Sequence, residues 1–248
     1  MDSNAYVVAP SGAPSGERHT HTIILLHGRD SIASEFAEEL FESQASDGRT
    51  LREIFPTVKW VFPTSKLRRS ARFNVEMSQW FDIWSVENPD ERFNIQIEGM
   101  RESVGEILSI VREEAAMVPV ERIFLGGISQ SAATAIHALL YGGVKLEGFI
   151  GMCSWLPFKL RTETPNPPRD LTNLSSVSVL QTPVFLSHSK DDDVVPVSNG
   201  RGLSKTLRED LGFKVKWNEY EEGGHWVNEP QGVDDWATFP EERIAARP

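Results

Sequence analysis

Short, continuous apolar runs recur along the chain, and each ends in glycine, proline or polar residues. Runs of this kind are typical of strands that are covered on both faces, as in a parallel sheet. A further segment, at 213–220, alternates apolar and polar positions, which predicts a strand nearer the edge of the sheet. The continuous runs occupy residues 22–28, 58–63, 122–127, 148–153 and 183–188.

Between these predicted strands, apolar residues recur at intervals of three and four, which is the spacing of an amphipathic helix. The pattern covers residues 97–111 and again residues 132–140. A third helix is predicted over 203–211, after Ser198 or Asn199, either of which is a suitable cap. Strands and helices therefore alternate in the order that builds an α/β fold.

We interpret the chain as one doubly wound α/β domain spanning residues 1–248, with residues 1–20 as an extended N-terminal lead. Two segments lack a clear period. Residues 64–94 carry many aromatic side chains, and residues 158–182 are rich in proline, serine and threonine. Both are expected to form loops over the carboxyl edge of the sheet, with irregular packing segments as the alternative.

Composition narrows the class of protein. The 248 residues are 40% apolar and 25% charged, as in an ordinary soluble globular protein. The formal net charge is -11 and no basic run compensates it, so we expect no nucleic-acid binding. No apolar stretch is long enough for a secretory signal or a membrane span, so we expect a cytoplasmic protein without stable membrane insertion. The single cysteine, Cys153, has apolar neighbours and is expected to be a buried structural thiol.

A candidate nucleophile lies where the strand at 122–127 meets the following helix. The segment GISQS, residues 127–131, has the framework Gly-x-Ser-x-Gly, with Ser131 in place of the last glycine. In such an elbow, a sharp turn lifts the serine above the sheet. It also leaves the next backbone N–H, that of Gln130, facing a developing oxyanion. Ser129 is therefore the candidate nucleophile.

A serine nucleophile needs a base and a group that orients the base. In α/β hydrolases the acid and then the histidine follow the serine along the chain. Three consecutive aspartates, Asp191, Asp192 and Asp193, follow the strand at 183–188, and His225 lies in a glycine-flanked loop after the next strand. The residues alone leave open which aspartate orients His225.

The other histidines fit the role of base less well. His27 follows the first continuous run and is expected to shape a turn, while His188 lies at a strand end and is expected to be structural. In the turn after His27, the backbone N–H of Arg29 is well placed as a second oxyanion donor, because such a donor commonly comes from a loop after an early strand. No clustered ligand spacing occurs, so a metal site is not expected.

Six short motifs stand out along the chain. They are LLHGRDS at 25–31, WFDI at 80–83, GISQSA at 127–132, SWLP at 154–157, HSKDDDVVP at 188–196 and GGHW at 223–226. Their order and spacing resemble the acyl-protein thioesterase and carboxylesterase family of small α/β hydrolases, from about residue 20 to about residue 228. The resemblance implies an α/β-hydrolase fold. It places the acid at Asp192, four residues before the proline of a pattern similar to His-Gly-x-x-Asp-x-x-Val-Pro.

The resemblance also implies hydrolysis of a thioester or carboxylic ester through an acyl-enzyme intermediate, without a cofactor. Ser129 would be the nucleophile, His225 the base and Asp192 its orienter, with the N–H groups of Arg29 and Gln130 around the oxyanion. The implied partner is an acyl ester or thioester substrate, including that of a lipidated protein. Candidates for an apolar acyl-binding surface are Leu67, Phe73, Trp80, Trp84, Trp155 and Leu156.

Three positions depart from the family pattern. Ser131 and Ser189 replace glycines, and Arg29 replaces a leucine often found in the oxyanion loop. The hydroxyl of Ser131 could alter the acyl pocket, and the cation of Arg29 could attract an acidic group. A carboxylesterase or lactonase for a small metabolite ester is therefore an alternative. A second alternative is a hydrolase scaffold that binds a ligand without turning it over.

Overall fold

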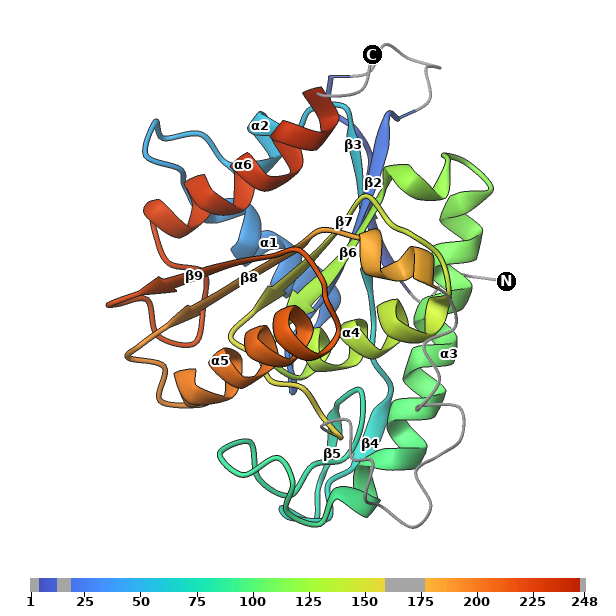
Figure 1. The fold of residues 1–248 in the computed structure, drawn as a ribbon, viewed down its shortest axis with the longest axis vertical. Helices are drawn as coiled ribbons and strands as arrows, with labels where there is room; N and C mark the ends of the chain where they lie inside the picture. The colour runs from blue at the N-terminus through green and yellow to red at the C-terminus, as the bar shows by residue number, and fades with distance from the viewer. Residues whose placement is uncertain (1–4, 13–18, 159–176, 246–248) are drawn as a thin grey trace.

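A mixed seven-stranded sheet forms the centre of the computed structural model, which describes residues 5–12, 19–158 and 177–245 (Figure 1). The strand order is β1-β3-β2-β6-β7-β8-β9. Only β1 runs antiparallel to its neighbour in this sheet, and the other pairs are parallel. The strands are β1 (Ala5–Val8), β2 (His21–Leu26), β3 (Val58–Pro63), β6 (Ile123–Ile128), β7 (Gly148–Met152), β8 (Val184–Ser189) and β9 (Val215–Tyr220).

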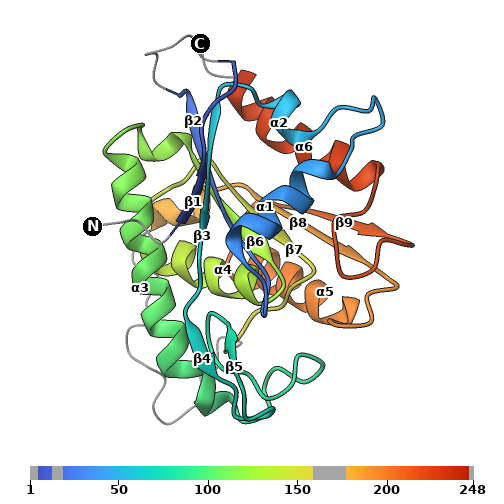
Figure 2. The same ribbon diagram turned by 180° about the vertical axis from the view of Figure 1, so that it is seen from behind.

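Helices cover both faces of the sheet, as Figures 1 and 2 show from opposite sides. One apolar cluster lies between the sheet and α3, α4 and α5, and a second lies between the sheet and α1, α2 and α6. The α-helices are α1 (Ala33–Glu42), α2 (Leu51–Ile54), α3 (Gln96–Ala115), α4 (Gln130–Gly142), α5 (Val197–Lys205) and α6 (Gln231–Ala245), and a π-helical turn (Thr206–Asp210) continues α5. Short 3-10 helices lie at Phe93–Ile95, Val120–Arg122 and Val177–Gln181. No helix among the described residues is long and apolar enough to cross a membrane.

The strands confirm the predictions from the apolar runs. Every residue of β2, β6, β7 and β8 is buried, because helices cover both faces of these central strands. Strand β9 lies at the edge of the sheet and is mostly half-buried, as its alternating pattern predicts. The predicted α/β architecture is therefore confirmed.

Two local predictions need correction. Residues 5–8, inside the predicted N-terminal lead, form strand β1 and pair with β3. Helix α5 has Pro196 at its N-cap, so the expectation of a cap at Ser198 or Asn199 is wrong. Proline is suited to a helix start because its φ is preset and because the first N–H groups of a helix have no partner within the helix.

The aromatic segment at 64–94 contains a hairpin of two short antiparallel strands, β4 (Leu67–Arg69) and β5 (Glu76–Ser78). It extends from the carboxyl end of β3 and lies beside α3 (Figure 1). Arg68 forms an ion pair with Glu102 of α3 at 2.8 Å. The backbone N–H of Asp30 donates to Ser78 O at 2.7 Å, which joins the hairpin to the turn after β2. The segment at 158–182 lies mostly outside the described residues.

Helix α4 carries a buried histidine, His137, whose ring stacks on that of Tyr141. Its Nε2 donates to Pro157 O at 3.1 Å, and its Nδ1 has no hydrogen-bond partner among the described residues. A proton added at Nδ1 would be a buried donor without an acceptor. Burial lowers the pKa of His137 to about 4.

Acidification is expected to destabilise the fold through His137. Between pH 6.5 and about pH 4 the unfolded chain binds a proton that the folded chain does not, so the free energy of unfolding falls as the pH falls. At about pH 4.5 the loss amounts to about 2–3 kcal/mol. His137→Gln keeps an N–H donor for Pro157 but does not titrate, and it should lack this part of the loss. Urea unfolding of both proteins, above pH 6.5 and at about pH 4.5, is the measurement. Equal losses of unfolding free energy in the two proteins would contradict the assignment.

Candidate active site

Ser129 occupies the turn between β6 and α4. Its backbone angles are φ 59° and ψ -127°, a left-handed conformation that residues other than glycine rarely adopt. The N–H of Ser129 donates to Met152 O at 2.8 Å, and the hydroxyl of Ser154 donates to Ser129 O at 2.8 Å. These bonds fix the strained residue against the end of β7, so the elbow predicted from the sequence is present.

Small residues on both sides make the elbow possible. A Cβ on Gly127 would lie 2.5 Å from Ser131 Oγ and 3.0 Å from Leu26 O, so only glycine fits there. The Ser131 hydroxyl is fully buried and lies 2.7 Å from both Leu26 O and Ile128 O. It also accepts the N–H of Ile128 at 3.0 Å. The serine that replaces the family glycine therefore braces the elbow against β2, and its hydrogen bonds are all to backbone.

His225 and Asp192 form a hydrogen-bonded pair. Nδ1 of His225 lies 2.7 Å from Asp192 Oδ2, and Asp192 Oδ1 accepts the N–H groups of Val194 and Val195 at 2.9 and 2.8 Å. Burial opposes ionisation of Asp192, but hydrogen bonds from His188, His225 and Val195 outweigh it and hold the pKa of Asp192 well below its usual range. The carboxylate is therefore charged at neutral pH and orients the His225 ring.

The two neighbouring aspartates have different surroundings. Asp191 accepts the N–H groups of Gly223 and Gly224 at 3.3 and 2.8 Å, and it thereby fixes the loop that leads to His225. Asp193 is exposed. The contact of Asp191 with this loop was not predicted from the sequence. Its only signal there is the glycine pair before His225.

Ser189, another departure from the family pattern, packs against the same loop. Its side chain is buried at the end of β8. A Cβ on Gly223 would lie 2.5 Å from Ser189 Oγ and 3.2 Å from Asn228 Cα. Gly223 also has a φ of 137°, which favours glycine. The loop before His225 is thus closely fitted to the end of β8.

The candidate nucleophile and the Asp192–His225 pair lie at the same edge of the sheet. Ser129 follows β6, Asp192 follows β8 and His225 follows β9, and the carboxyl ends of parallel strands share one edge. Between them, Cys153 follows β7, donates its N–H to Ser187 O at 2.9 Å, and holds its Sγ within 4.8 Å of an Asp192 oxygen. Among the described residues no hydrogen bond joins Ser129 Oγ to the His225 ring, and catalytic hydrogen bonds are often loose before substrate binds.

Two backbone N–H groups near this edge belong to the residues predicted to surround the oxyanion. Those of Arg29 and Gln130 donate to no other group within the described residues. The Gln130 side chain, in contrast, is hydrogen-bonded through both of its polar atoms: its Oε1 accepts the N–H of Trp80 and its Nε2 donates to Phe81 O, each at 2.9 Å. The Gln130 side chain therefore links the start of α4 to the loop before α3, while its backbone N–H has no acceptor among the described residues.

The Arg29 side chain is directed to the hairpin. Its Nε donates to Gln79 Oε1 at 3.0 Å, its terminal nitrogen donates to Ser70 Oγ at 3.1 Å, and the guanidinium lies over the ring of Phe73. These contacts use the cation to join the turn after β2 to the β4–β5 hairpin. The guanidinium that was expected to attract an acidic substrate group is therefore already hydrogen-bonded within the protein. Attraction of such a group stays a prediction.

His27 shapes the same turn, as the sequence predicts. Its Nδ1 bonds to Gly28 O at 2.7 Å, and its Nε2 accepts the N–H of Ser65 at 3.1 Å. Its backbone oxygen accepts the indole N–H of Trp80 at 2.9 Å. Burial lowers the pKa of His27. Because both ring nitrogens are bonded to backbone, His27 has no free nitrogen for proton transfer.

The residues predicted to form an acyl-binding surface fall into two sets. One set is buried in the apolar cluster on the α3 and α4 side of the sheet. The other lies on or beside the hairpin, where two side chains are mostly exposed and the third is half-buried. An acyl-binding role stays a prediction for both sets. Trp80, Trp155 and Leu156 form the buried set, and Leu67, Phe73 and Trp84 form the surface set.

Cys153, His188 and Asp192 are the potential metal ligands that gather among the described residues, with their ligating atoms within 4.8 Å of one another. Burial raises the pKa of the Cys153 thiol, and the charge of Asp192 raises it further. Both oxygens of Asp192 already accept hydrogen bonds, so hydrogen bonding accounts for this group of side chains.

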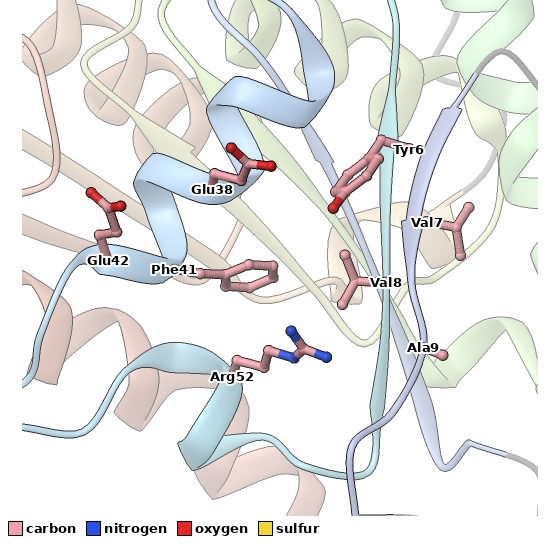
Figure 3. Close-up of a pocket in the computed structure, with 8 residues that line it drawn as sticks. All are labelled: Tyr6, Val7, Val8, Ala9, Glu38, Phe41, Glu42 and Arg52. Carbon is pink, nitrogen blue, oxygen red and sulfur yellow. The ribbon is translucent and has the colours of Figure 1, made fainter.

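Two grooves flank helix α1. The larger, of about 610 Å³, lies between β1, α1 and α2, and Figure 3 shows Tyr6, Phe41 and Arg52 pointing into it. The smaller, of about 380 Å³, shares Glu42 with the first and reaches Trp226, the neighbour of His225. None of the residues predicted for the site lines either groove.

A mostly parallel sheet of this order, with a strained serine at a strand-to-helix turn and an Asp–His pair at its carboxyl edge, defines an α/β hydrolase. Within this class, the phospholipase/carboxylesterase family matches residues 8–240. The chain belongs to that family.

Individual relatives agree with this assignment. The chain is 30% identical over 237 residues to acyl-protein thioesterase 1 of Gibberella zeae, with 94% of each chain covered. It is 29% identical to acyl-protein thioesterase 1 of Yarrowia lipolytica over 84% of this chain and 86% of the relative. Its fold matches the crystal structure of Zea mays acyl-protein thioesterase 2 with a TM-score of 0.74 and 24% identity, over 97% of this chain and 98% of that one.

Proposed function

We propose that this protein is a serine hydrolase that cleaves acyl thioesters or esters, with Ser129 as nucleophile, His225 as base and Asp192 as the residue that orients the base. The observation that carries the proposal is the strained Ser129 elbow at the sheet edge that also holds the bonded Asp192–His225 pair. Membership of the phospholipase/carboxylesterase family supports it.

In this mechanism Ser129 Oγ attacks the acyl carbonyl and its proton passes to Nε2 of His225. The carbonyl oxygen becomes an oxyanion, which accepts hydrogen bonds from the backbone N–H groups of Arg29 and Gln130. His225 then gives the proton to the departing thiol or alcohol, which leaves the acyl group on Ser129. Water attacks this acyl-enzyme with His225 again as base, and the carboxylic acid and free Ser129 are the products.

The substrate class that we propose is an S-acylated or O-acylated protein or a lipid ester. Two relatives that align along most of this chain are acyl-protein thioesterases by name. Leu67 and Phe73 are 72% and 52% exposed on the hairpin that Arg29 ties to the oxyanion turn, where they could meet an acyl chain. We also propose a cytoplasmic location, in which the buried thiol of Cys153 stays reduced.

A set of three substrates tests the proposal: a peptide with a long-chain S-acyl cysteine, the matched peptide with an O-acyl serine, and a short-chain nitrophenyl ester. We expect hydrolysis of all three, with the S-acyl peptide giving the highest kcat/KM. Cleavage of the nitrophenyl ester alone would favour a small-metabolite esterase or lactonase. No cleavage by the folded protein would favour the ligand-binding scaffold and contradict the proposal.

A further inference from the structure

A second histidine ring meets the carboxylate of Asp192. His188 lies near the end of β8, four residues before Asp192, and its side chain is fully buried. Its Nε2 is 3.0 Å from Asp192 Oδ2 and 2.9 Å from Val195 O. Nδ1 of His225 approaches the same Oδ2 at 2.7 Å. One carboxylate oxygen therefore faces two imidazole rings, of which only one is the proposed base.

These contacts define where the hydrogen on His188 lies. Nε2 faces a carboxylate oxygen and a carbonyl oxygen, both of which only accept, so Nε2 carries the hydrogen. Nδ1 is buried without a hydrogen-bond partner among the described residues. On that side the ring abuts α5, because a Cβ added to Gly200 would lie 2.4 Å from Nδ1. The ring is therefore wedged between the backbone of α5 and the carboxylate.

We propose that His188 is a positioning residue for the hydrolysis, whose Nε2–H fixes Asp192 Oδ2 and takes up part of its negative charge. The inference rests on the proposed function, because His188 acts only through the Asp192–His225 pair. Within the described residues, the hydrogen bonds of His188 reach Asp192 and Val195, and none reaches Ser129 or the oxyanion donors. Its effect on the rate would come from the position and the charge of the carboxylate that holds the base.

Removing this donor has two consequences. Asp192 loses a contact that fixes its position, so the His225 ring is less well oriented and kcat falls. The carboxylate also becomes a stronger partner for protonated His225, which moves the acid limb of the pH–rate profile to higher pH. The other titratable groups here are Cys153, whose thiol is kept protonated by burial, and Asp191, which binds the loop before His225. The Cys153 thiol is a weak donor and lies 3.5 Å from Trp226 O, so His188 Nε2–H is the strong donor that the substitution removes.

The experiment compares His188→Leu with His188→Gln, because the amide nitrogen of glutamine can donate where His188 Nε2 does. Hydrolysis of a short-chain nitrophenyl ester is followed from about pH 5 to about pH 9, the range that brackets histidine titration. For His188→Leu we expect kcat to fall about tenfold to a hundredfold with KM nearly unchanged. We expect its acid midpoint to rise by about half a pH unit or more. His188→Gln should keep the wild-type midpoint and most of the rate.

His137→Gln is the matched control, because His137 is also a buried histidine but does not touch Asp192. It should leave the acid midpoint unchanged. A wild-type midpoint in His188→Leu, with activity lost only in proportion to the unfolded fraction, would overturn the inference. Equal impairment of His188→Gln and His188→Leu would also overturn it. Absence of hydrolysis and of fluorophosphonate labelling in the wild type would overturn the proposed function, and this inference with it.

Discussion

Ser129→Ala is expected to lower kcat/KM for a nitrophenyl ester by about 10⁴-fold or more, because the acyl-enzyme can no longer form. The fold should survive, since the elbow is held by backbone bonds of Ser129 that alanine retains. Steady-state kinetics gives the loss. Intact mass after treatment with a fluorophosphonate gives an independent readout, with one adduct expected on the wild type and none on the variant.

Ser198→Ala is the control for this experiment, because Ser198 is an exposed serine in α5. It should retain wild-type kinetics and labelling. Peptide mapping of the wild-type adduct decides between serines within the elbow. An adduct on Ser131 would show that the assignment of Ser129 as nucleophile is wrong. We do not expect one, because the buried Ser131 hydroxyl is bonded to the backbone of Leu26 and Ile128.

Asp192→Asn is expected to lower kcat by about 10³- to 10⁴-fold. The amide can present its N–H group to His225 Nδ1, which favours the tautomer that cannot accept the serine proton at Nε2. Because the pKa of Asp192 is lowered, its carboxylate stays charged as the pH falls below neutral. The loss in the variant should therefore persist across the whole pH range in which the wild type is active. Kinetics from about pH 6 to about pH 9 measures it.

Two matched variants distinguish the contribution of Asp192 from those of the neighbouring carboxylates. Asp193→Asn removes an exposed charge and should change kcat by less than about twofold. Asp191→Asn weakens the contacts to Gly223 and Gly224, so we expect an intermediate loss. If Asp193→Asn abolished turnover while Asp192→Asn left it intact, the assignment of the acid would be wrong.

The central strands could be predicted because their burial leaves a direct record in the sequence. Residues 23–26 of β2 and 123–125 of β6 are apolar without interruption, since helices cover both faces of these strands. Helix α1 left a weaker record: Ala33, Phe36, Ala37 and Leu40 have helical spacing, but two of the four are alanines. Helix α6 contains Pro240, and a proline inside a pattern predicts an end rather than a continuation.

The candidate site could be proposed from the sequence where one residue type in one local context is typical of the chemistry. The Gly-x-Ser framework between a strand and a helix, and the histidine that follows a pair of glycines, are such cases. The contacts of Arg29 with Ser70 and Gln79, and of Asp191 with Gly223, join segments far apart in the sequence. No local pattern records them, because they depend on how the hairpin and the loops pack.

The left-handed backbone conformation of Ser129 lowers the stability of the fold at the residue that the proposed activity requires. A non-glycine residue in such a conformation costs on the order of 1–3 kcal/mol, and a glycine there would relieve most of it. The fold would thus be more stable without its proposed nucleophile. The surrounding hydrogen bonds to Met152 and from Ser154 must outweigh this strain, which makes the rigidity of two neighbouring strand ends a requirement of the chemistry.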